Sequence, residues 1–477
     1  MVMPGASVAR EVSGIEKVAC IDCHLREGKA FSESVHVSVD NLDCRTCHGG
    51  EKRYSVETGI VEQLRQVASR PADSGLGDDA SRFDHGSAFR GKPTRRDIPQ
   101  RCGTCHADVT AMNPYGLATD QLAQYRTSGH GRALYQRQDE RVAVCTDCHG
   151  THNVMKADDP ASPVHAKNVP DTCGRCHEDA SLMGPSQLST RVVAEYRRSV
   201  HGQGLLEQGD VGMPHCATCH GSHAAVPPGY RDVGHVCGRC HQQEEQHFLA
   251  SPHAKFSMFP RCVGCHTPEG NARDHWIRRV AASPEVIRET YARLLDVHPG
   301  TRIDDPKTQA AFEARREPPV QQYETICLRC HHPRVRSAHR AFFSELDAQA
   351  AQSGATLYQL VRQAELSYAA ATERVERVGR GVLLVTDEAL LAEEMRTKLV
   401  SLAPIQHALN EEKLTQAVEE LNALAEQVHT SLDDKVRGLR WRYWALLPIW
   451  SCIAVFVTAL WVKYKQLKHA LVAEGTG

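Results

Sequence analysis

The pattern Cys-x-x-Cys-His recurs nine times in this chain of 477 residues, and it limits what the chain can fold into more than any other feature. In this pattern the two thiols can form thioether bonds to the vinyl groups of a haem. The histidine that follows is held beneath the ring, where its imidazole can ligate the iron. The nine motifs use eighteen of the nineteen cysteines. The sequence therefore predicts nine covalently bound c-type haems as cofactors.

The predicted haem-attachment residues are the two cysteines of each motif, namely Cys20, Cys23, Cys44, Cys47, Cys102, Cys105, Cys145, Cys148, Cys173, Cys176, Cys216, Cys219, Cys237, Cys240, Cys262, Cys265, Cys327 and Cys330. The predicted proximal iron ligands are the motif histidines, namely His24, His48, His106, His149, His177, His220, His241, His266 and His331. Zinc is the main rival, since paired Cys-x-x-Cys knuckles form tetrahedral sites, but zinc does not require a histidine after every second cysteine. A disulfide framework fits less well, because two-residue spacing strains the bridge and leaves the histidine without a role.

The haem motifs all lie between Cys20 and His331, at roughly 35 residues per haem, which is too little protein to build a separate core around each cofactor. We therefore expect the haems to lie near one another and to supply much of the core. Aromatic content is only 6%, consistent with porphyrins providing the large apolar planes. No alternating apolar run is long enough to predict a sheet. The expected fold class is mainly α with much coil, wrapped on haems.

A longer repeat lies beneath the motifs. The sequence Tyr-x-x-Ser-x-His-Gly begins at Tyr125 and at Tyr196, and each copy precedes a motif that continues as CHGTH or CHGSH and is followed by a CGRCH motif. Looser copies run over residues 31–36 and 248–253. The haem-binding part thus comprises one leading haem and four two-haem units. Repeated units that cannot close their own core stack on their neighbours, which predicts a row of haems.

The repeat also nominates histidines for the second axial position of each iron, since imidazole is the natural partner in a low-spin electron-transfer haem. Three groups recur at equivalent places, and a ninth candidate follows the last motif: His36, His130, His201 and His253; His152 and His223; His85 and His165; and His339. The remaining candidates are held in reserve: His215, His235, His247, His275, His298 and His332. The pairing of histidine to haem cannot be read from the sequence.

From about residue 337 strong helix formers dominate, which predicts helices over 356–378, 386–402 and 409–436. Breaks are expected at Gly354, at residues 379–381 and at Pro404. In the last helix, apolar residues at Leu414, Val418, Leu421 and Leu424 form a stripe at helical spacing. We expect an antiparallel helical bundle, which would serve as a stalk, as a dimer surface or as a brace for the haems. Two of its histidines, His407 and His429, are further candidates to ligate a membrane-proximal haem.

One transmembrane helix is predicted over Ala445–Val462, an uncharged apolar segment that is just long enough to cross the hydrocarbon. Tyr443, Trp444, Trp461 and Tyr464 flank it as an aromatic belt, and Pro448 is expected in its first turn. A buried soluble helix is the alternative. The predicted domains are a nonahaem cytochrome c domain (1–336), the helical bundle (337–440), and the anchor with a short cytoplasmic tail (441–477).

The compartment follows from the haem chemistry, because c-type haems are attached outside the cytoplasm. We expect the haem domain on the periplasmic face of the cytoplasmic membrane, anchored once at the C-terminus. This requires an export signal, and residues 1–9 have neither a charged start nor an apolar stretch, although Ser7-Val8-Ala9 looks like a cleavage site. The formal net charge of −2, before haem propionates are counted, shows no basic footprint, so nucleic acid is not an expected partner.

The CHGTH and CHGSH motifs, their Tyr-x-x-Ser-x-His-Gly lead-ins and the CGRCH followers resemble the multihaem cytochrome c superfamily, which runs from tetrahaem to octahaem members. The long C-terminal helices are similar to those of hydroxylamine oxidoreductase-like octahaem (class III) proteins, and the resemblance covers about residues 15–440. The chain departs from the family by having nine motifs. It also lacks a Cys-x-x-Cys-Lys motif, and its anchor is C-terminal where quinol-oxidising tetrahaem relatives carry an N-terminal one.

Two functions are weighed on this basis. The first is a membrane-anchored cytochrome relaying electrons between a quinone-linked membrane partner, such as a cytochrome b or iron–sulfur subunit, and periplasmic donors or acceptors. The alternative is an oxidoreductase of the hydroxylamine, nitrite or sulfur-compound type, in which one haem keeps an open site near Tyr358 or Tyr368. No catalytic residue is assigned. The lipid bilayer is an expected partner, and a homo-oligomer is compatible with the sequence.

Overall fold

The computed structural model describes residues 20, 24–40, 42–49, 88–228, 233–255, 261–268, 273–279, 284–297 and 346–474. In these segments the chain is mainly helical, as the sequence predicts, and the only β-pairing is an isolated bridge between Gly49 and Phe89. The chain divides into two compact units. The first comprises Met1–Val236 and Cys262–Ile277, and the second comprises Cys237–Arg261 and Arg278–Gly477.

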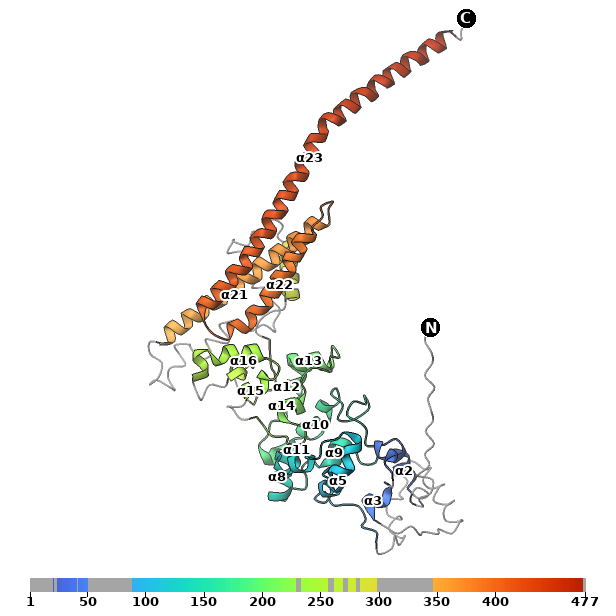
Figure 1. Ribbon diagram of the computed structural model, residues 1–477, viewed down its shortest axis with the longest axis vertical. Coiled ribbons are helices and arrows are strands. Elements are labelled where there is room, and N and C mark those ends of the chain that lie inside the picture. The colour runs from blue at the N-terminus through green and yellow to red at the C-terminus, as the bar shows by residue number, and fades with distance from the viewer. Residues whose placement is uncertain are drawn as a thin grey trace. The chain divides into compact units, whose positions relative to one another are not determined.

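Short helices make up the haem-motif region, and many of them are a single turn (Figure 1). In chain order they are α2 (Leu25–Ser32), η2 (Val35–Ser38), α3 (Cys44–His48), α5 (Ile98–His106), α6 (Val109–Met112), η4 (Asn113–Tyr115), α7 (Gln121–Thr127), α8 (Gly129–Gln136), α9 (Cys145–His149), α10 (Val169–His177), α11 (Ala180–Met183), η5 (Gly184–Ser186), α12 (Val192–Arg198), α13 (Val200–Leu206), α14 (Cys216–His220), α15 (Val233–Gly238), α16 (Gln242–Leu249), η6 (Pro252–Lys255) and α17 (Arg261–His266). Among these helices Tyr125, Leu134 and Val144 form a small buried hydrophobic cluster.

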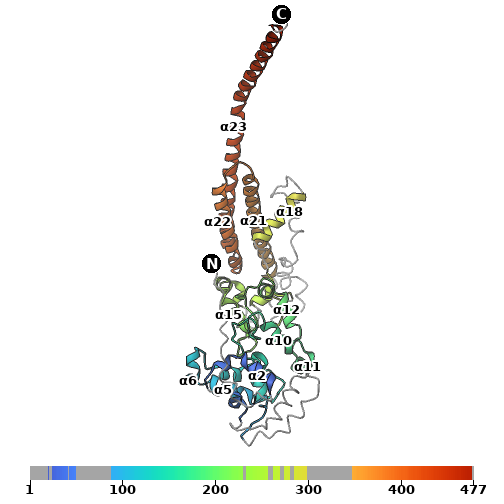
Figure 2. The same cartoon turned by 90° about the vertical axis from the view of Figure 1, so that its right-hand side faces the viewer.

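Four longer helices belong to the second unit: α18 (Pro284–Val297), α21 (Leu346–Gly379), α22 (Thr386–Gln406) and α23 (Glu411–Glu474). Helices α21, α22 and α23 lie side by side in both views (Figures 1 and 2). The apolar stripe of α23 faces this packing, with Leu414, Val418 and Leu421 at most 1% exposed. The stripe joins Met395 and Leu402 of α22 and apolar residues of α18 and α21 in one hydrophobic core.

Three expectations about helix boundaries are wrong. Gly354 does not break a helix but lies inside α21, where the burial of apolar residues in the shared core outweighs a propensity cost of about 1 kcal/mol. Pro404 lies in the last turn of α22, which continues two residues past it. Pro448 does not lie in a first turn, because α23 runs unbroken from the bundle through the apolar segment.

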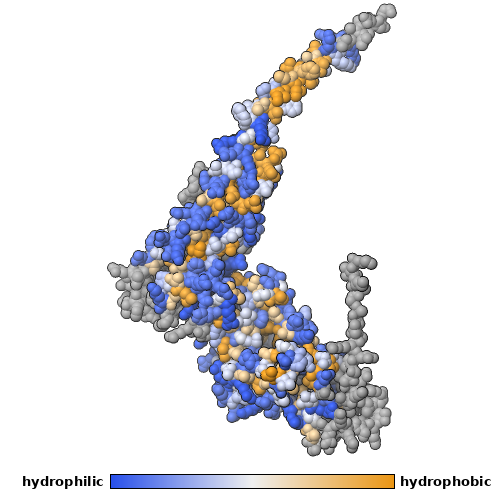
Figure 3. Space-filling model, viewed as in Figure 1, coloured by the Kyte–Doolittle hydropathy of each residue, from blue (hydrophilic) through white to orange (hydrophobic). Residues whose placement is uncertain are grey.

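One helix in the described part of the chain, α23, is long and apolar enough to cross a membrane. Its most apolar 18-residue window has a mean hydropathy of 2.2 and is wholly exposed. Figure 3 shows this window as an apolar band on α23. Trp441 and Trp444, on its N-terminal flank, are 74% and 69% exposed. A helix whose apolar surface is uncovered all round matches a membrane span better than a core helix of a soluble protein.

A buried ion pair joins α22 to α23. The carboxylate of Glu388 is fully buried, and it accepts hydrogen bonds from Ser431 and from Lys435, whose Nζ lies 2.7 Å from Oε2. Burial by itself would raise the pKa of Glu388, but these two donors outweigh it and the pKa is lowered from its ordinary value of 4.5. Stability from this pair is therefore present above pH 4.5 and is lost as the pH falls through the lowered pKa.

We expect Glu388→Gln to destabilise the helical unit by about 2 kcal/mol at pH 7, because Lys435 loses its buried counter-charge. Urea unfolding followed by far-UV circular dichroism measures this, and the difference from wild type should shrink as the pH falls through the lowered pKa of Glu388. The matched control is Glu420→Gln, which removes a half-exposed ion pair with Lys398 at 2.7 Å. This control should leave the free energy of unfolding nearly unchanged, because an exposed ion pair contributes little to stability. Equal losses for the two variants would contradict the prediction.

Candidate haem-binding site

The first motif of each of the first three repeated units is a one-turn helix that begins at a cysteine and ends at the histidine: α3, α9 and α14. The residue before the second cysteine caps this turn. Thr46, Asp147 and Thr218 each accept a hydrogen bond from the backbone N–H three residues earlier. The glycine after the histidine has a positive φ at all three places, a left-handed conformation that favours glycine. Local geometry therefore explains two positions around these motifs: the capping residue before the second cysteine and the glycine after the histidine.

The second motif of a unit lies on a longer helix that has a proline near its N-terminus, as in α5 and α10. The glycine of CGTCH has a packing role, because a Cβ on Gly103 would lie 2.3 Å from Cδ2 of Leu122 on α7. A Cβ on Gly174, in CGRCH, would make an ordinary contact of 3.7 Å with Cγ1 of Val193 on α12. The helix that carries the haem motif thus packs closely against the helix that leads to the next histidine.

The Tyr-x-x-Ser-x-His-Gly repeat forms the same structure twice. The hydroxyl of Tyr125 donates to the carbonyl of Ala143 at 2.9 Å, and that of Tyr196 donates to the carbonyl of Pro214 at 3.0 Å. Each bond spans eighteen residues and ties the lead-in to the segment just before a motif. The serine of each copy then caps the following helix, so that His130 and His201 lie in the first turns of α8 and α13.

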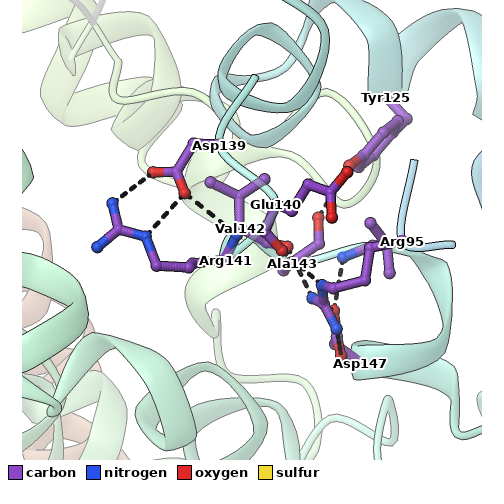
Figure 4. Close-up of polar contacts among 9 residues, drawn as sticks. Arg95, Tyr125, Asp139, Glu140, Arg141, Val142, Ala143 and Asp147 are labelled. Carbon is purple, nitrogen blue, oxygen red and sulfur yellow. Dashed lines mark hydrogen bonds and ion pairs between the residues drawn. The ribbon is translucent and has the colours of Figure 1, made fainter. Parts of the chain in front are cut away.

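Arg95 fixes the approach to the motif that begins at Cys145 (Figure 4). Its guanidinium pairs with Asp147 at 2.5 Å and donates to the carbonyls of Glu140 and Val142 at 2.6 and 2.8 Å. Since Asp147 also caps α9, one arginine from the segment before α5 holds both the loop and the first turn of the motif helix.

Five motif histidines each stand opposite a histidine that belongs to no motif. The ring centroids lie 6.1 Å apart for His36 and His106, 6.2 Å for His48 and His152, 6.1 Å for His130 and His177, 6.0 Å for His149 and His223, and 5.8 Å for His220 and His275. Two imidazoles on opposite sides of one metal ion, each bonded at about 2 Å, place their ring centroids roughly 6 Å apart. All five pairs fit two axial ligands of one haem iron.

No protein-family model matches this chain, and neither the curated proteins nor the solved structures give a match.

The five pairs follow two rules. In the first, the lead-in histidine of a unit faces the second-motif histidine of the same unit, as His36 faces His106 and His130 faces His177. In the second, the first-motif histidine of a unit faces a histidine from the next unit, as His149 faces His223. Successive two-motif repeats are therefore joined by histidine pairs to which each of the two repeats contributes one ring.

Four of the predicted distal histidines face a motif histidine: His36, His130, His152 and His223. His275, held in reserve by the sequence, also does so. His275 lies nine residues after the motif histidine His266, whereas His152 and His223 lie three residues after theirs. The shared position, after the first motif of a repeat, is the sequence signal that could have identified His275. His165 is half-buried, and its Nδ1 makes no hydrogen bond within the described residues. His201 and His253 lie on α13 and η6, and His85 and His339 lie outside the described residues.

In three of the pairs, burial lowers the pKa of both rings, and nearby histidines add to the effect in some of them. A lowered pKa favours the neutral form of these six rings, which is the form that ligates metal. Backbone carbonyls also orient several rings. Nδ1 of His48, His220 and His275 lies 3.2, 3.1 and 3.0 Å from a carbonyl oxygen. Because a carbonyl can only accept, Nδ1 carries the proton and the lone pair is on Nε2.

Cysteines of the first six motifs bring successive motifs together. Cys44 hydrogen-bonds to Cys20, Cys145 to Cys102, and Cys173 to Cys216, which joins the first motif to the second, the third to the fourth and the fifth to the sixth. Cys47 interacts electrostatically with Cys102, and Cys148 with Cys173, which closes the remaining steps. The first six motifs are thus neighbours in chain order.

Tyr358 and Tyr368, the two tyrosines considered for an open haem site, lie on α21 in the second compact unit. Tyr368 is 3% exposed and belongs to the hydrophobic core, where burial raises its pKa. The hydroxyl of Tyr358 accepts a hydrogen bond at 3.3 Å from Arg362, which also pairs with the buried Glu365. Tyr368 therefore has a structural role in the packing of the bundle.

Proposed function

We propose that this protein is a membrane-anchored multihaem c-type cytochrome that relays electrons between a quinone-linked membrane partner and redox partners outside the membrane. The single observation that supports it best is the set of five histidine pairs at 5.8–6.2 Å, each containing one motif histidine. The donor set, two thiols and two imidazoles per site, suits covalent attachment and axial ligation of haem. A haem held in this way supplies one-electron iron redox chemistry.

The residues of the chain perform three tasks in this proposal. The motif cysteines would hold each haem, and the capped helical turn between them would fix the motif histidine. The second histidine of a pair would supply the other imidazole to the iron, which would favour electron transfer over binding of a small substrate. The contacts between cysteines of successive motifs keep neighbouring sites close.

The proposed location is the periplasmic face of the cytoplasmic membrane, with α23 as a single anchor. A helix without haem ligands of its own cannot carry electrons across the bilayer, so the anchor would hold the haem row beside a membrane partner. The partner that fits is a quinol-oxidising cytochrome b or iron–sulfur subunit. A periplasmic protein would exchange electrons at the other end of the row, and assembly with further copies of the chain fits the same proposal.

The test uses the full chain, purified in detergent from a host that attaches c-type haems. We expect a pyridine haemochrome assay to give nine haems per chain, and low-temperature EPR with near-infrared magnetic circular dichroism to show only low-spin bis-histidine iron. Absence of haem would overturn the proposal and would favour zinc binding by the Cys-x-x-Cys-His motifs. A high-spin haem whose signal shifts with nitrite, hydroxylamine or sulfite would support the oxidoreductase in its place.

A further inference from the structure

A backbone hydrogen bond recurs in three successive repeats, and it ties the lead-in of one repeat to a histidine segment of the next. The residue before each lead-in histidine donates its N–H to a carbonyl two residues beyond the histidine that follows the next repeat's first motif. The three bonds run from Val35 to Val154 at 2.8 Å, from Gly129 to Ala225 at 2.9 Å, and from Val200 to Ile277 at 3.0 Å. Each bond fixes the segment that presents a distal histidine.

The first two of these segments are short. His152 and His223 each lie three residues after a motif histidine. The glycine that follows the motif histidine turns the chain with a positive φ in both. The motif turn on one side and the backbone bond on the other therefore locate each distal ring.

The third segment is longer, because His275 lies nine residues after its motif histidine. A longer connection restricts the position of the ring less, since the entropy of a loop grows with its length. The ring nevertheless lies 5.8 Å from that of His220, with an angle of 20° between the two ring planes. Contacts beyond the motif turn therefore hold this segment.

Helix α12 supplies two such contacts within the same compact unit. A carboxylate oxygen of Glu195 accepts the backbone N–H of His275 itself at 3.1 Å. Three residues later on the same face of the helix, the guanidinium of Arg198 lies over the ring of Trp276, 3.6 Å from its centroid, which is a favourable cation–π geometry. The carboxylate of Glu195 is oriented in turn by Arg191, at 3.4 Å.

The preceding copy of the lead-in has different residues at these two positions. Gln124 and Thr127 stand there in place of Glu195 and Arg198. Both bond within their own segment: the amide of Gln124 donates to Asp120 at 2.7 Å, and the hydroxyl of Thr127 donates to the carbonyl of Gln124 at 2.9 Å. That copy faces a short segment, which the motif turn already locates. The acidic and basic pair thus accompanies the long segment.

We propose that α12 positions His275 as a haem ligand through two side chains, Glu195 and Arg198. This inference rests on the proposed function. Glu195 fixes the backbone of the ligand residue, and Arg198 fixes the next residue through the face of Trp276. Neither side chain touches the iron. Together they replace the restraint that a three-residue connection gives to the distal histidines of the earlier repeats.

The experiment compares the double variant Glu195→Ala/Arg198→Ala with Arg197→Ala in the full chain, purified in detergent from a host that attaches c-type haems. Arg197 is a matched control, because it lies on the same helix and pairs with Asp171 of α10 at 2.7 Å. We expect the double variant to retain nine haems, of which up to one becomes high-spin in EPR and binds carbon monoxide when reduced. Added imidazole should return that haem to low spin. Arg197→Ala should keep the wild-type spectrum.

Conservative variants separate positioning from general packing. Glu195→Gln keeps an oxygen that can accept the backbone N–H of His275. Arg198→Lys keeps a cation that can lie over the ring of Trp276. The chain that carries both conservative changes should therefore show the wild-type EPR spectrum, with every haem low-spin.

Trp276→Ala covers the case in which the double variant does not accumulate, because it removes the cation–π contact and leaves the sequence of α12 intact. It should change the EPR signal of one haem, and Trp276→Phe, which keeps an aromatic face, should restore that signal. A wild-type spectrum in the double variant, or in Trp276→Ala where the double variant does not accumulate, would overturn the inference and leave the proposed function intact. So would a high-spin haem in Arg197→Ala as well. A wild-type chain without haem would instead overturn the proposed function.

Discussion

His275→Ala is expected to convert one of nine haems from low-spin to high-spin, since this residue faces the motif histidine His220 at 5.8 Å. Removal of the imidazole would leave one axial position of this iron open. The freed position should bind carbon monoxide in the reduced protein and cyanide in the oxidised protein. EPR and optical titration measure the change, and the stoichiometry should be one site per chain.

The informative control is His215→Ala. The sequence gives His215 and His275 equal standing, because both lie outside the repeated positions. The structure separates them: His215 precedes α14, where its backbone N–H donates to Thr218, whereas the ring of His275 is stacked opposite a motif histidine. We therefore expect His215→Ala to leave the spin state of every haem unchanged. If His215→Ala produced a high-spin haem and His275→Ala did not, the ring pairs would not identify the haem ligands.

His275→Met offers a second readout at the same position. Methionine can replace the imidazole as a ligand while keeping the iron low-spin, and histidine–methionine ligation raises the reduction potential of a c-type haem. Spectroelectrochemical titration should show one haem moving to a higher potential with the others unchanged. A uniform shift of all nine haems would indicate a general change of structure and would contradict a specific role for His275.

The local geometry of the Cys-x-x-Cys-His motifs and of their repeat follows from the sequence, because capping and turn formation are local. Cys-x-x-Cys-His is a single helical turn, and the glycine and threonine around it follow from the φ value and the cap of that turn. The lead-in is equally local: Tyr196, Ser199 and Gly202 form the same contacts as their counterparts seventy-one residues earlier. A pattern that repeats in sequence because it repeats in geometry can be read without a structure.

What the sequence does not contain is the pairing between units. His149 faces a histidine seventy-four residues away, and the choice of partner depends on how successive units stack. The helix boundaries fail for a related reason. Gly354 is a helix breaker by local preference, but α21 continues through it because apolar residues such as Leu357 and Leu366 are buried in the shared core. Tertiary burial decides where local propensity is weak, and neither a ring pair nor a shared core can be located from residue spacing alone.

Gly131→Ala is expected to be among the most destabilising single-methyl additions in the chain. A Cβ at this position would lie 1.9 Å from the carbonyl oxygen of Tyr125 and 2.8 Å from its carbonyl carbon, so backbone and not a flexible side chain must move. The same carbonyl accepts the hydroxyl of Ser128, which caps α8, and the movement would therefore disturb the corner that presents His130. We expect a loss of about 3 kcal/mol or more in the free energy of unfolding.

The repeat supplies an internal replicate, and an open glycine supplies the control. A Cβ on Gly202 would lie 2.0 Å from the carbonyl oxygen of Tyr196, so Gly202→Ala should cost as much as Gly131→Ala. Gly184 has no atom within 4 Å of its Cβ position, and its φ is that of an ordinary helical residue. Gly184→Ala should therefore leave the free energy of unfolding nearly unchanged, as surface substitutions without a special contact usually do.

Urea unfolding of the three full-length variants, followed by circular dichroism and by the haem absorption band, separates these expectations. If Gly131→Ala and Gly202→Ala were as harmless as Gly184→Ala, the tight corner before each lead-in histidine would not be a requirement of the fold. The glycine in Tyr-x-x-Ser-x-His-Gly would then need another explanation, because the backbone of the tyrosine and of the arginine after it is what excludes a side chain there.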